Sequence, residues 1–160
     1  MDGLTELAAR LGRNLLAQQA QACTAESCTG GGIAEAITRV AGSSAWFDCG
    51  MAAYSYEAKQ ALLRVRPETL MTHGAVSKET ALEMVSGALI TSGASLAVAV
   101  TGIAGPGGGL PGKPVGTVWI AWKRRGQYPK AEVFHFNGAR EAVRRQTVAM
   151  ALQGLTVLTG

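Results

Sequence analysis

Apolar positions recur with helical spacing in three long stretches of the chain. The first predicts an amphipathic helix over about residues 5–19. The second, over about 78–92, lies between Ser77, which can cap its start, and Gly93, which can end it. The third covers about 139–158, and its predicted core face carries Val143, Val148, Ala151, Leu152 and Leu155.

Shorter apolar runs predict strands. We expect a short strand at 22–24, a mostly buried one at 46–54, and one at 96–101 buried on both faces as in a parallel sheet. Two more, at 116–122 and 133–136, are expected to pair antiparallel.

Three short helical segments separate these strands. They cover 33–40, then 55–63 with Ser55 as a cap, then a brief turn opened by Pro67. This order of elements predicts an α/β fold: a three-layer α/β/α sandwich with a mixed, mainly parallel sheet, formed by a single domain over residues 1–160.

Composition narrows the class of protein. The 160 residues are 48% apolar, which suits one globular domain. No apolar run approaches the roughly 20 residues that span a bilayer, and Met1–Leu4 lack the basic start of a secretion signal, so we expect a cytoplasmic protein without membrane contact. The net charge is +4 and the pI about 9.2, but the basic residues are scattered, so we expect no nucleic-acid partner.

Cysteine and histidine usage argues against a metal centre. The three cysteines form no C-x-x-C pair, which indicates a reducing compartment and neither disulfides nor zinc. His73 and His135 stand outside any metal-ligand pattern, and His135 falls inside a predicted strand, where a packed residue is expected. We therefore expect a site that needs no metal and no cofactor.

The stretch 25–32, Ala-Glu-Ser-Cys-Thr-Gly-Gly-Gly, places two hydroxyls, a thiol and three glycines close together. It follows a predicted strand and precedes a predicted helix, so the glycines are expected to form a tight turn. Free N–H groups at the helix start favour negative charge, and a serine held there can act as a nucleophile. A serine or threonine that merely caps the helix fits the same pattern.

Two further segments are expected to join this turn beyond the carboxyl ends of the strands. One is the loop 102–112, with six glycines and two prolines, and the other follows the remaining central strand, which ends at Tyr54. Lys59 is the candidate base for Ser27, because burial and its place near a helix start lower a lysine's pKa. Cys28 as nucleophile and either histidine as base remain alternatives at this point.

Several motifs in a fixed order resemble the CinA C-terminal domain family, the nicotinamide-nucleotide amidohydrolases. The resemblance runs from Thr24 to about Leu155. Its motifs are Ala25–Gly31, Gly42–Phe47, Tyr54–Ser55 with Glu57–Lys59, His73–Ser77, Thr101–Pro106, Lys113–Val118, and Gly138–Arg140 with Val143–Arg144.

The resemblance implies hydrolysis of the carboxamide of nicotinamide mononucleotide, with Ser27 as nucleophile and Lys59 as its partner. It also implies a homo-oligomer. The expected substrate-binding residues are Cys28, Thr29, Gly30, Gly31, Tyr54, Thr101, Gly102, Gly105, Arg140 and Arg144. Among these, we expect Arg140 and Arg144 to bind the phosphate, and the ring of Tyr54 to stack on the pyridinium.

Two positions depart from the family's pattern. Tyr56 stands where an asparagine is usual, and Gly107 where an acid is frequent. Both lie near the expected pocket, so an amidase for a related amide is one alternative. A catalytically weak nucleotide-binding or partner protein on the same scaffold is another.

Overall fold

The computed structural model describes residues 2–160; Met1, the first residue of the segment examined for a secretion signal, lies outside them. The helices are α1 (Gly3–Gln18), α2 (Gly32–Thr38), α3 (Tyr56–Leu63), α4 (Pro67–His73), α5 (Lys78–Thr91) and α6 (Arg140–Leu158), with a 3₁₀ turn η1 (Ser43–Ala45). The strands are β1 (Ala22–Glu26), β2 (Phe47–Ala52), β3 (Leu96–Gly102), β4 (Thr117–Arg124) and β5 (Lys130–His135). Ser55 and Ser77 cap α3 and α5, as expected.

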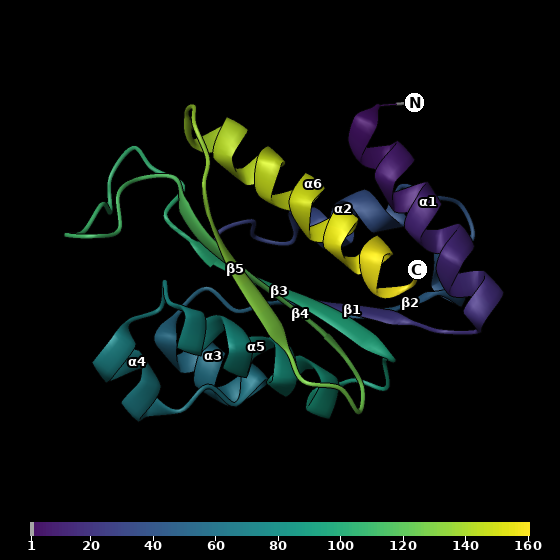
Figure 1. Ribbon diagram of the computed structural model, residues 1–160, viewed down its shortest axis with the longest axis horizontal. Coiled ribbons are helices and arrows are strands. Elements are labelled where there is room, and N and C mark those ends of the chain that lie inside the picture. The colour runs from purple at the N-terminus through teal and green to yellow at the C-terminus, as the bar shows by residue number, and fades with distance from the viewer. Residues whose placement is uncertain (1) are drawn as a thin grey trace.

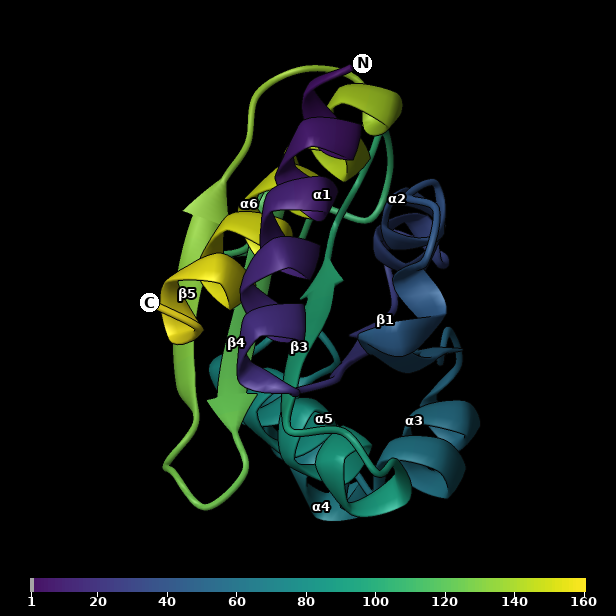
Figure 2. The same ribbon diagram turned by 90° about the vertical axis from the view of Figure 1, so that its right-hand side faces the viewer.

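The strands form one mixed sheet in the order β2-β1-β3-β4-β5. Figure 2 shows β1, β3, β4 and β5 side by side in this order. β1 pairs parallel with both β2 and β3, whereas β4 is antiparallel to β3 and β5 antiparallel to β4. β1, β2, β3 and β5 therefore run in one direction and β4 in the other. This confirms the predicted mixed, mainly parallel sheet.

Helices cover both faces of the sheet (Figure 1). α1, α2 and α6 lie on one face, and α3, α4 and α5 on the other. Each face has its own apolar core, and all five residues of the predicted core face of α6 are buried in the first. The α/β/α sandwich is thus confirmed. No helix within residues 2–160 has the length and apolar character needed to cross a membrane.

α3, which carries Lys59, is seated directly against α5. The contact is close because Gly87 of α5 has no side chain: a Cβ there would lie 1.7 Å from the carbonyl oxygen of Leu63. A larger residue would push the end of α3 away from α5. The glycine therefore helps to fix the helix that brings the lysine to the end of the sheet.

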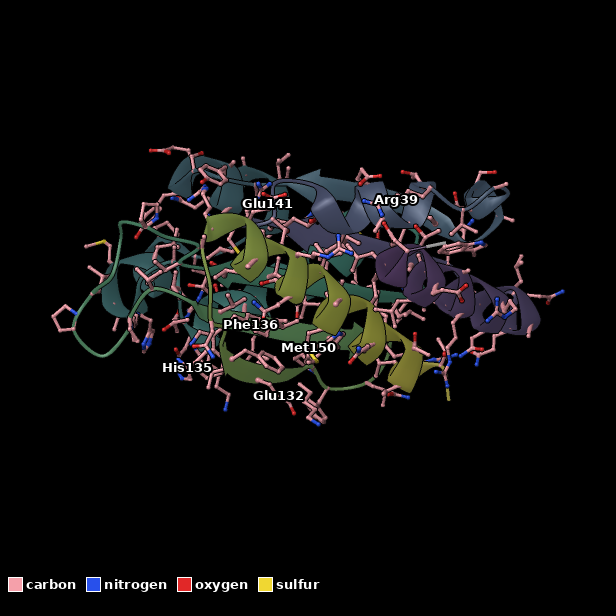
Figure 3. The ribbon with its side chains drawn as sticks, turned by 90° about the horizontal axis from the view of Figure 1, so that it is seen from above. Arg39, Glu132, His135, Phe136, Glu141 and Met150 are labelled. Carbon is pink, nitrogen blue, oxygen red and sulfur yellow. The ribbon has the colours of Figure 1, made fainter. Side chains whose placement is uncertain are left out.

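Two expectations about burial are wrong. β2 is an edge strand with β1 as its one neighbour, so its residues alternate between half-buried and exposed instead of being mostly buried. His135 ends β5 at the opposite edge and is exposed, not packed; Figure 3 shows it at the outer margin with Glu132. In both cases an edge strand has no neighbour on its outer side to cover it.

Candidate active site

Ser27 is the first residue after β1, at the carboxyl end of the sheet. Its N–H donates to the carbonyl of Val100 at 3.1 Å, which continues the β1–β3 pairing by one residue. The chain then reverses into α2, with Gly30 and Gly31 at φ of +59° and +102°, a region that side-chain-bearing residues rarely adopt. The serine is 8% exposed, so its hydroxyl is held at an almost enclosed position.

Lys59, the fourth residue of α3, reaches this serine. Its Nζ lies 3.0 Å from Ser27 Oγ, 3.1 Å from the carbonyl oxygen of Ala53 and 3.2 Å from that of Tyr54. The residue is 1% exposed, and this burial lowers the pKa of its ammonium. We expected the helix start to contribute to the lowering; burial is its dominant cause.

The other candidate nucleophile and bases are less suited. Burial raises the pKa of the Cys28 thiol to about 12, so it stays protonated near neutral pH. His73 is exposed and pairs with Glu79 at 3.5 Å, and His135 lies at the far sheet edge. Within residues 2–160, neither histidine hydrogen-bonds Ser27, whose Oγ has Lys59 as its partner.

A cavity of about 200 Å³ opens beside the turn formed by residues 27–31, which we call the serine turn. The turn contributes Cys28 to its lining, the segment after β2 contributes Tyr54, and α6 contributes Arg140. The rest comes from the glycine loop after β3: Gly102, Ile103, Ala104, Gly105, Gly107 and Gly108. The predicted meeting of these three segments is therefore confirmed, although the strand before Tyr54 lies at an edge and not at the centre of the sheet.

The two arginines at the start of α6 differ in their contacts. Arg140 donates to the carbonyl of Gly105 at 2.9 Å and to the Tyr54 hydroxyl at 3.2 Å, both in the cavity wall. Arg144 donates instead to the carbonyls of Cys28 at 3.2 Å and Thr29 at 3.1 Å. Arg140 thus faces the cavity, whereas Arg144 holds the serine turn.

Other expected binding residues lie outside the lining of this cavity. Thr101 is buried, and its hydroxyl donates to the carbonyl of Ala75 at 2.8 Å. The Thr29 hydroxyl donates to Glu26, and Gly30 and Gly31 form the turn itself. These residues lie near Ser27 without lining the cavity.

Glu26 has a structural role that the sequence motifs did not indicate. Its carboxylate is 1% exposed and accepts the N–H groups of Ile33 at 2.8 Å and Ala34 at 3.0 Å, in the first turn of α2. The expectation that these N–H groups are free for a ligand is therefore wrong. An acid at the end of a strand, directly before a glycine turn and a helix, is a pattern that could have suggested this cap.

Outside the surroundings of Ser27, the described part of the chain offers a further groove but no metal site. Residues 2–160 hold no group of three or more His, Cys, Asp or Glu side chains placed to bind a metal ion. A second groove of about 250 Å³ lies between the β4–β5 hairpin and α6, with Trp122, Met150 and Val157 in its lining. Its charged residues, Lys130 and Glu132, face each other at 3.6 Å. This groove has no nucleophile–base pair like that of Ser27.

The chain is similar in sequence and in fold to known proteins. The chain is 58% identical over 159 residues to nicotinamide-nucleotide amidohydrolase PncC of Pseudomonas putida, covering 99% of this chain and 98% of that protein. It is 51% identical over 154 residues to the protein of the same name from Escherichia coli (strain K12), covering 95% and 92%. The crystal structure of competence/damage inducible protein CihA from Agrobacterium tumefaciens superimposes with a TM-score of 0.97 at 46% identity, covering 100% and 98%.

The family model described as CinA C-terminal domain matches residues 4–158, which is nearly the whole chain. The two relatives also match over nearly the whole chain, and the solved structure from Agrobacterium tumefaciens has the same fold as this chain. The chain therefore belongs to the CinA C-terminal domain family.

Proposed function

We propose that this chain hydrolyses the carboxamide of nicotinamide mononucleotide to nicotinic acid mononucleotide and ammonia. The observation that carries the proposal is the buried Ser27–Lys59 pair, 3.0 Å apart, beside a cavity that presents an arginine and a tyrosine. The names of the two relatives described above support the same substrate class. Ser27 acts as nucleophile and Lys59 as general base.

The surroundings of Lys59 suit both of its protonation states. A neutral amine has two N–H groups, which match the carbonyls of Ala53 and Tyr54, and a lone pair, which matches the hydroxyl of Ser27. After it takes the serine proton, the ammonium has three N–H groups for the same three oxygens. Proton transfer therefore requires no rearrangement, and the lowered pKa keeps more of the neutral form available at a given pH.

The reaction proceeds through an acyl-enzyme. Ser27 Oγ bonds to the carboxamide carbon, the C=O π electrons move to oxygen, and Lys59 holds the serine proton. Collapse of this intermediate breaks the C–N bond, and Lys59 gives its proton to the departing ammonia. Water then attacks the ester, with Lys59 as base, and releases the carboxylic acid and free Ser27.

The backbone N–H groups of Cys28 and Thr29 stabilise the oxyanion. They are available because, within residues 2–160, neither donates to an acceptor on another residue. In the part of the chain that the structure describes, the N–H of Gly30 donates to the Ser27 carbonyl and that of Gly32 to the Thr29 carbonyl, both at 3.0 Å, whereas that of Gly31 donates to no acceptor. The hydrogen bonds therefore exclude Gly30 and leave Cys28, Thr29 and Gly31 as donors. Of these, Cys28 and Thr29 directly follow the nucleophile in the chain.

The cavity wall binds the rest of the nucleotide. Arg140 takes the phosphate, because it uses two of its five N–H groups on Gly105 and Tyr54 and keeps the others free. The ring of Tyr54, which is 64% exposed, stacks on the cationic pyridinium. Gly102 and Gly105 let the loop backbone approach the ligand closely, and Gly107 in the same wall adds no carboxylate to repel the phosphate.

The test compares three substrates with the native chain: nicotinamide mononucleotide, its riboside without phosphate, and free nicotinamide. Ammonia release is measured together with mass identification of the acid product. The proposal predicts the highest kcat/KM for the mononucleotide. A preference for another amide would indicate a changed specificity, and tight nucleotide binding without ammonia release would indicate a non-catalytic binding protein.

A further inference from the structure

We infer that Glu26 is a positioning residue of this site: its buried carboxylate fixes the turn that presents the N–H groups of Cys28 and Thr29 to the oxyanion. The inference rests on the proposed function for its chemistry. Its structural basis is independent, because it comes from the hydrogen bonds of a side chain that contacts neither Ser27 Oγ nor Lys59 Nζ within residues 2–160.

The Glu26 carboxylate bonds the strand before the turn, the turn itself and the helix after it. One carboxylate oxygen accepts the Thr29 hydroxyl at 2.5 Å and the N–H of Ile33 at 2.8 Å. The other accepts the N–H of Ala34 at 3.0 Å and the Thr24 hydroxyl at 3.3 Å. The last residue of β1 is thus tied to the middle of the turn and to the start of α2, so the intervening backbone closes around one carboxylate.

The alternation of side chains along a strand explains why this acid takes no part in the proton transfer. Successive residues point to opposite faces of a sheet, so Glu26 and Ser27 are directed apart. Glu26 faces α2, together with Thr24 two residues earlier, whereas Ser27 faces Lys59 of α3. Glu26 therefore supports the backbone on one face while the serine reacts on the other.

Peptide planarity links these contacts to the oxyanion donors. The C=O and N–H of a trans peptide point in opposite directions, so fixing one fixes the other. The Ser27 carbonyl accepts from Gly30, which orients the N–H of Cys28. The Cys28 carbonyl accepts from Arg144, which orients the N–H of Thr29. Glu26 holds the turn from inside and Arg144 holds it from outside.

Glutamine cannot replace this carboxylate without loss. All four partners of Glu26 are donors, and an ionised carboxylate offers only acceptors. Whichever way an amide is turned, its NH₂ meets one backbone N–H and one threonine hydroxyl; the hydroxyl can turn to accept, but the N–H loses its acceptor. The variant Glu26→Gln therefore keeps the volume of the side chain and releases one side of the turn.

The test measures kcat and KM of Glu26→Gln on nicotinamide mononucleotide. Misplacing an oxyanion donor lowers kcat by about 100-fold. KM stays within about threefold of native, because no residue lining the cavity is altered. In a plot of kcat/KM against pH, the midpoint of the rise from acid pH is expected to stay the same, since Lys59 keeps all three of its partners. Thr29→Val, which removes one of the four bonds, gives a smaller loss of kcat and serves as a second variant should Glu26→Gln fold poorly.

Glu83→Gln is the matched control. Glu83 also ties a helix start, accepting the N–H of Arg66 at 2.8 Å and the Thr69 hydroxyl at 2.6 Å at the beginning of α4. It lies away from the serine turn, so it is expected to lower the Tm without lowering kcat. An equal loss of kcat in both variants, or none in Glu26→Gln, overturns the inference.

A second readout separates this inference from the proposed substrate. A fluorophosphonate reagent phosphonylates an activated serine: the Oγ–P bond forms, fluoride leaves and the proton passes to Lys59. The rate, followed by intact mass, is expected to be about 100-fold lower in Glu26→Gln than in the native chain. A native chain that reacts but hydrolyses no nucleotide refutes the substrate alone; equal rates in the two chains refute the role of Glu26 alone.

Discussion

The contrast between Arg140 and Arg144 gives a quantitative prediction about substrate selection. Arg140→Met removes the guanidinium that faces the cavity and keeps much of its apolar stem. A hydrogen bond to a charged group contributes about 1.5–3 kcal/mol, and 1.4 kcal/mol corresponds to a factor of ten. We therefore expect kcat/KM for nicotinamide mononucleotide to fall by about 10- to 150-fold.

The phosphate-free riboside provides the internal control. Arg140→Met is expected to change its kcat/KM little, so the preference for the nucleotide over the nucleoside shrinks by nearly the whole factor. Arg145→Met, an exposed neighbour outside the cavity lining, is expected to leave both values unchanged. The assay is ammonia release from the two substrates at matched ionic strength. Equal losses on nucleotide and nucleoside in Arg140→Met would refute the assignment of the phosphate to this arginine.

Three further predictions concern the base, the thiol and the fold. Only neutral Lys59 accepts a proton, and burial lowers its pKa, so kcat/KM is expected to rise with pH. The midpoint of this rise is expected below the ordinary lysine pKa of 10.5. The pH profile of Lys59→Arg checks the assignment, because the rise should move to higher pH or disappear. Cys28→Ala is expected to keep most of the activity, since the thiol is protonated. Ammonia release by the variant measures this, and complete loss of activity would contradict the prediction. Gly87→Ala is expected to lower the free energy of unfolding by about 1–3 kcal/mol through its clash with Leu63, and calorimetry should show Tm falling by about 2–4 °C per kcal/mol.

The elements that local patterns could predict are those with strong periodicity or clear boundaries. α1, α5 and α6 follow apolar spacing, and serine caps mark the starts of α3 and α5. β3 was predicted as a buried strand because its residues are continuously apolar, and it lies between β1 and β4. These features depend on interactions close in sequence or on burial of a whole segment.

Features that depend on residues distant in the chain could not be predicted from the sequence. The apolar run at 46–54 gave no indication that β2 has a single neighbour, because the order of strands is set by the placement of β3 on the other side of β1. The strand expected at 22–24 continues to Glu26, whose buried carboxylate accepts N–H groups of α2, a contact with residues seven and eight positions further along the chain. The different roles of Arg140 and Arg144 likewise depend on side-chain direction at one end of α6.

Within the candidate site, the sequence indicated which segments would meet but not how they bond. The serine turn, the segment after β2 and the glycine loop were expected at one crevice, and they line one cavity. The roles of Ser27 and Lys59 stay predictions, as do the homo-oligomer and the cytoplasmic location. The structure adds the distance between the two side chains and the oxygens that surround the amine.

The most direct test of the account is ammonia release from nicotinamide mononucleotide by the native chain, Ser27→Ala and Lys59→Met, with Lys78→Met as an exposed control. The account predicts an active native chain, an unaffected Lys78→Met, and losses in the other two of at least about 100-fold, the usual contribution of a general base or more. Activity that survives in Ser27→Ala would contradict the central claim and turn attention to Cys28, the thiol that lines the same cavity.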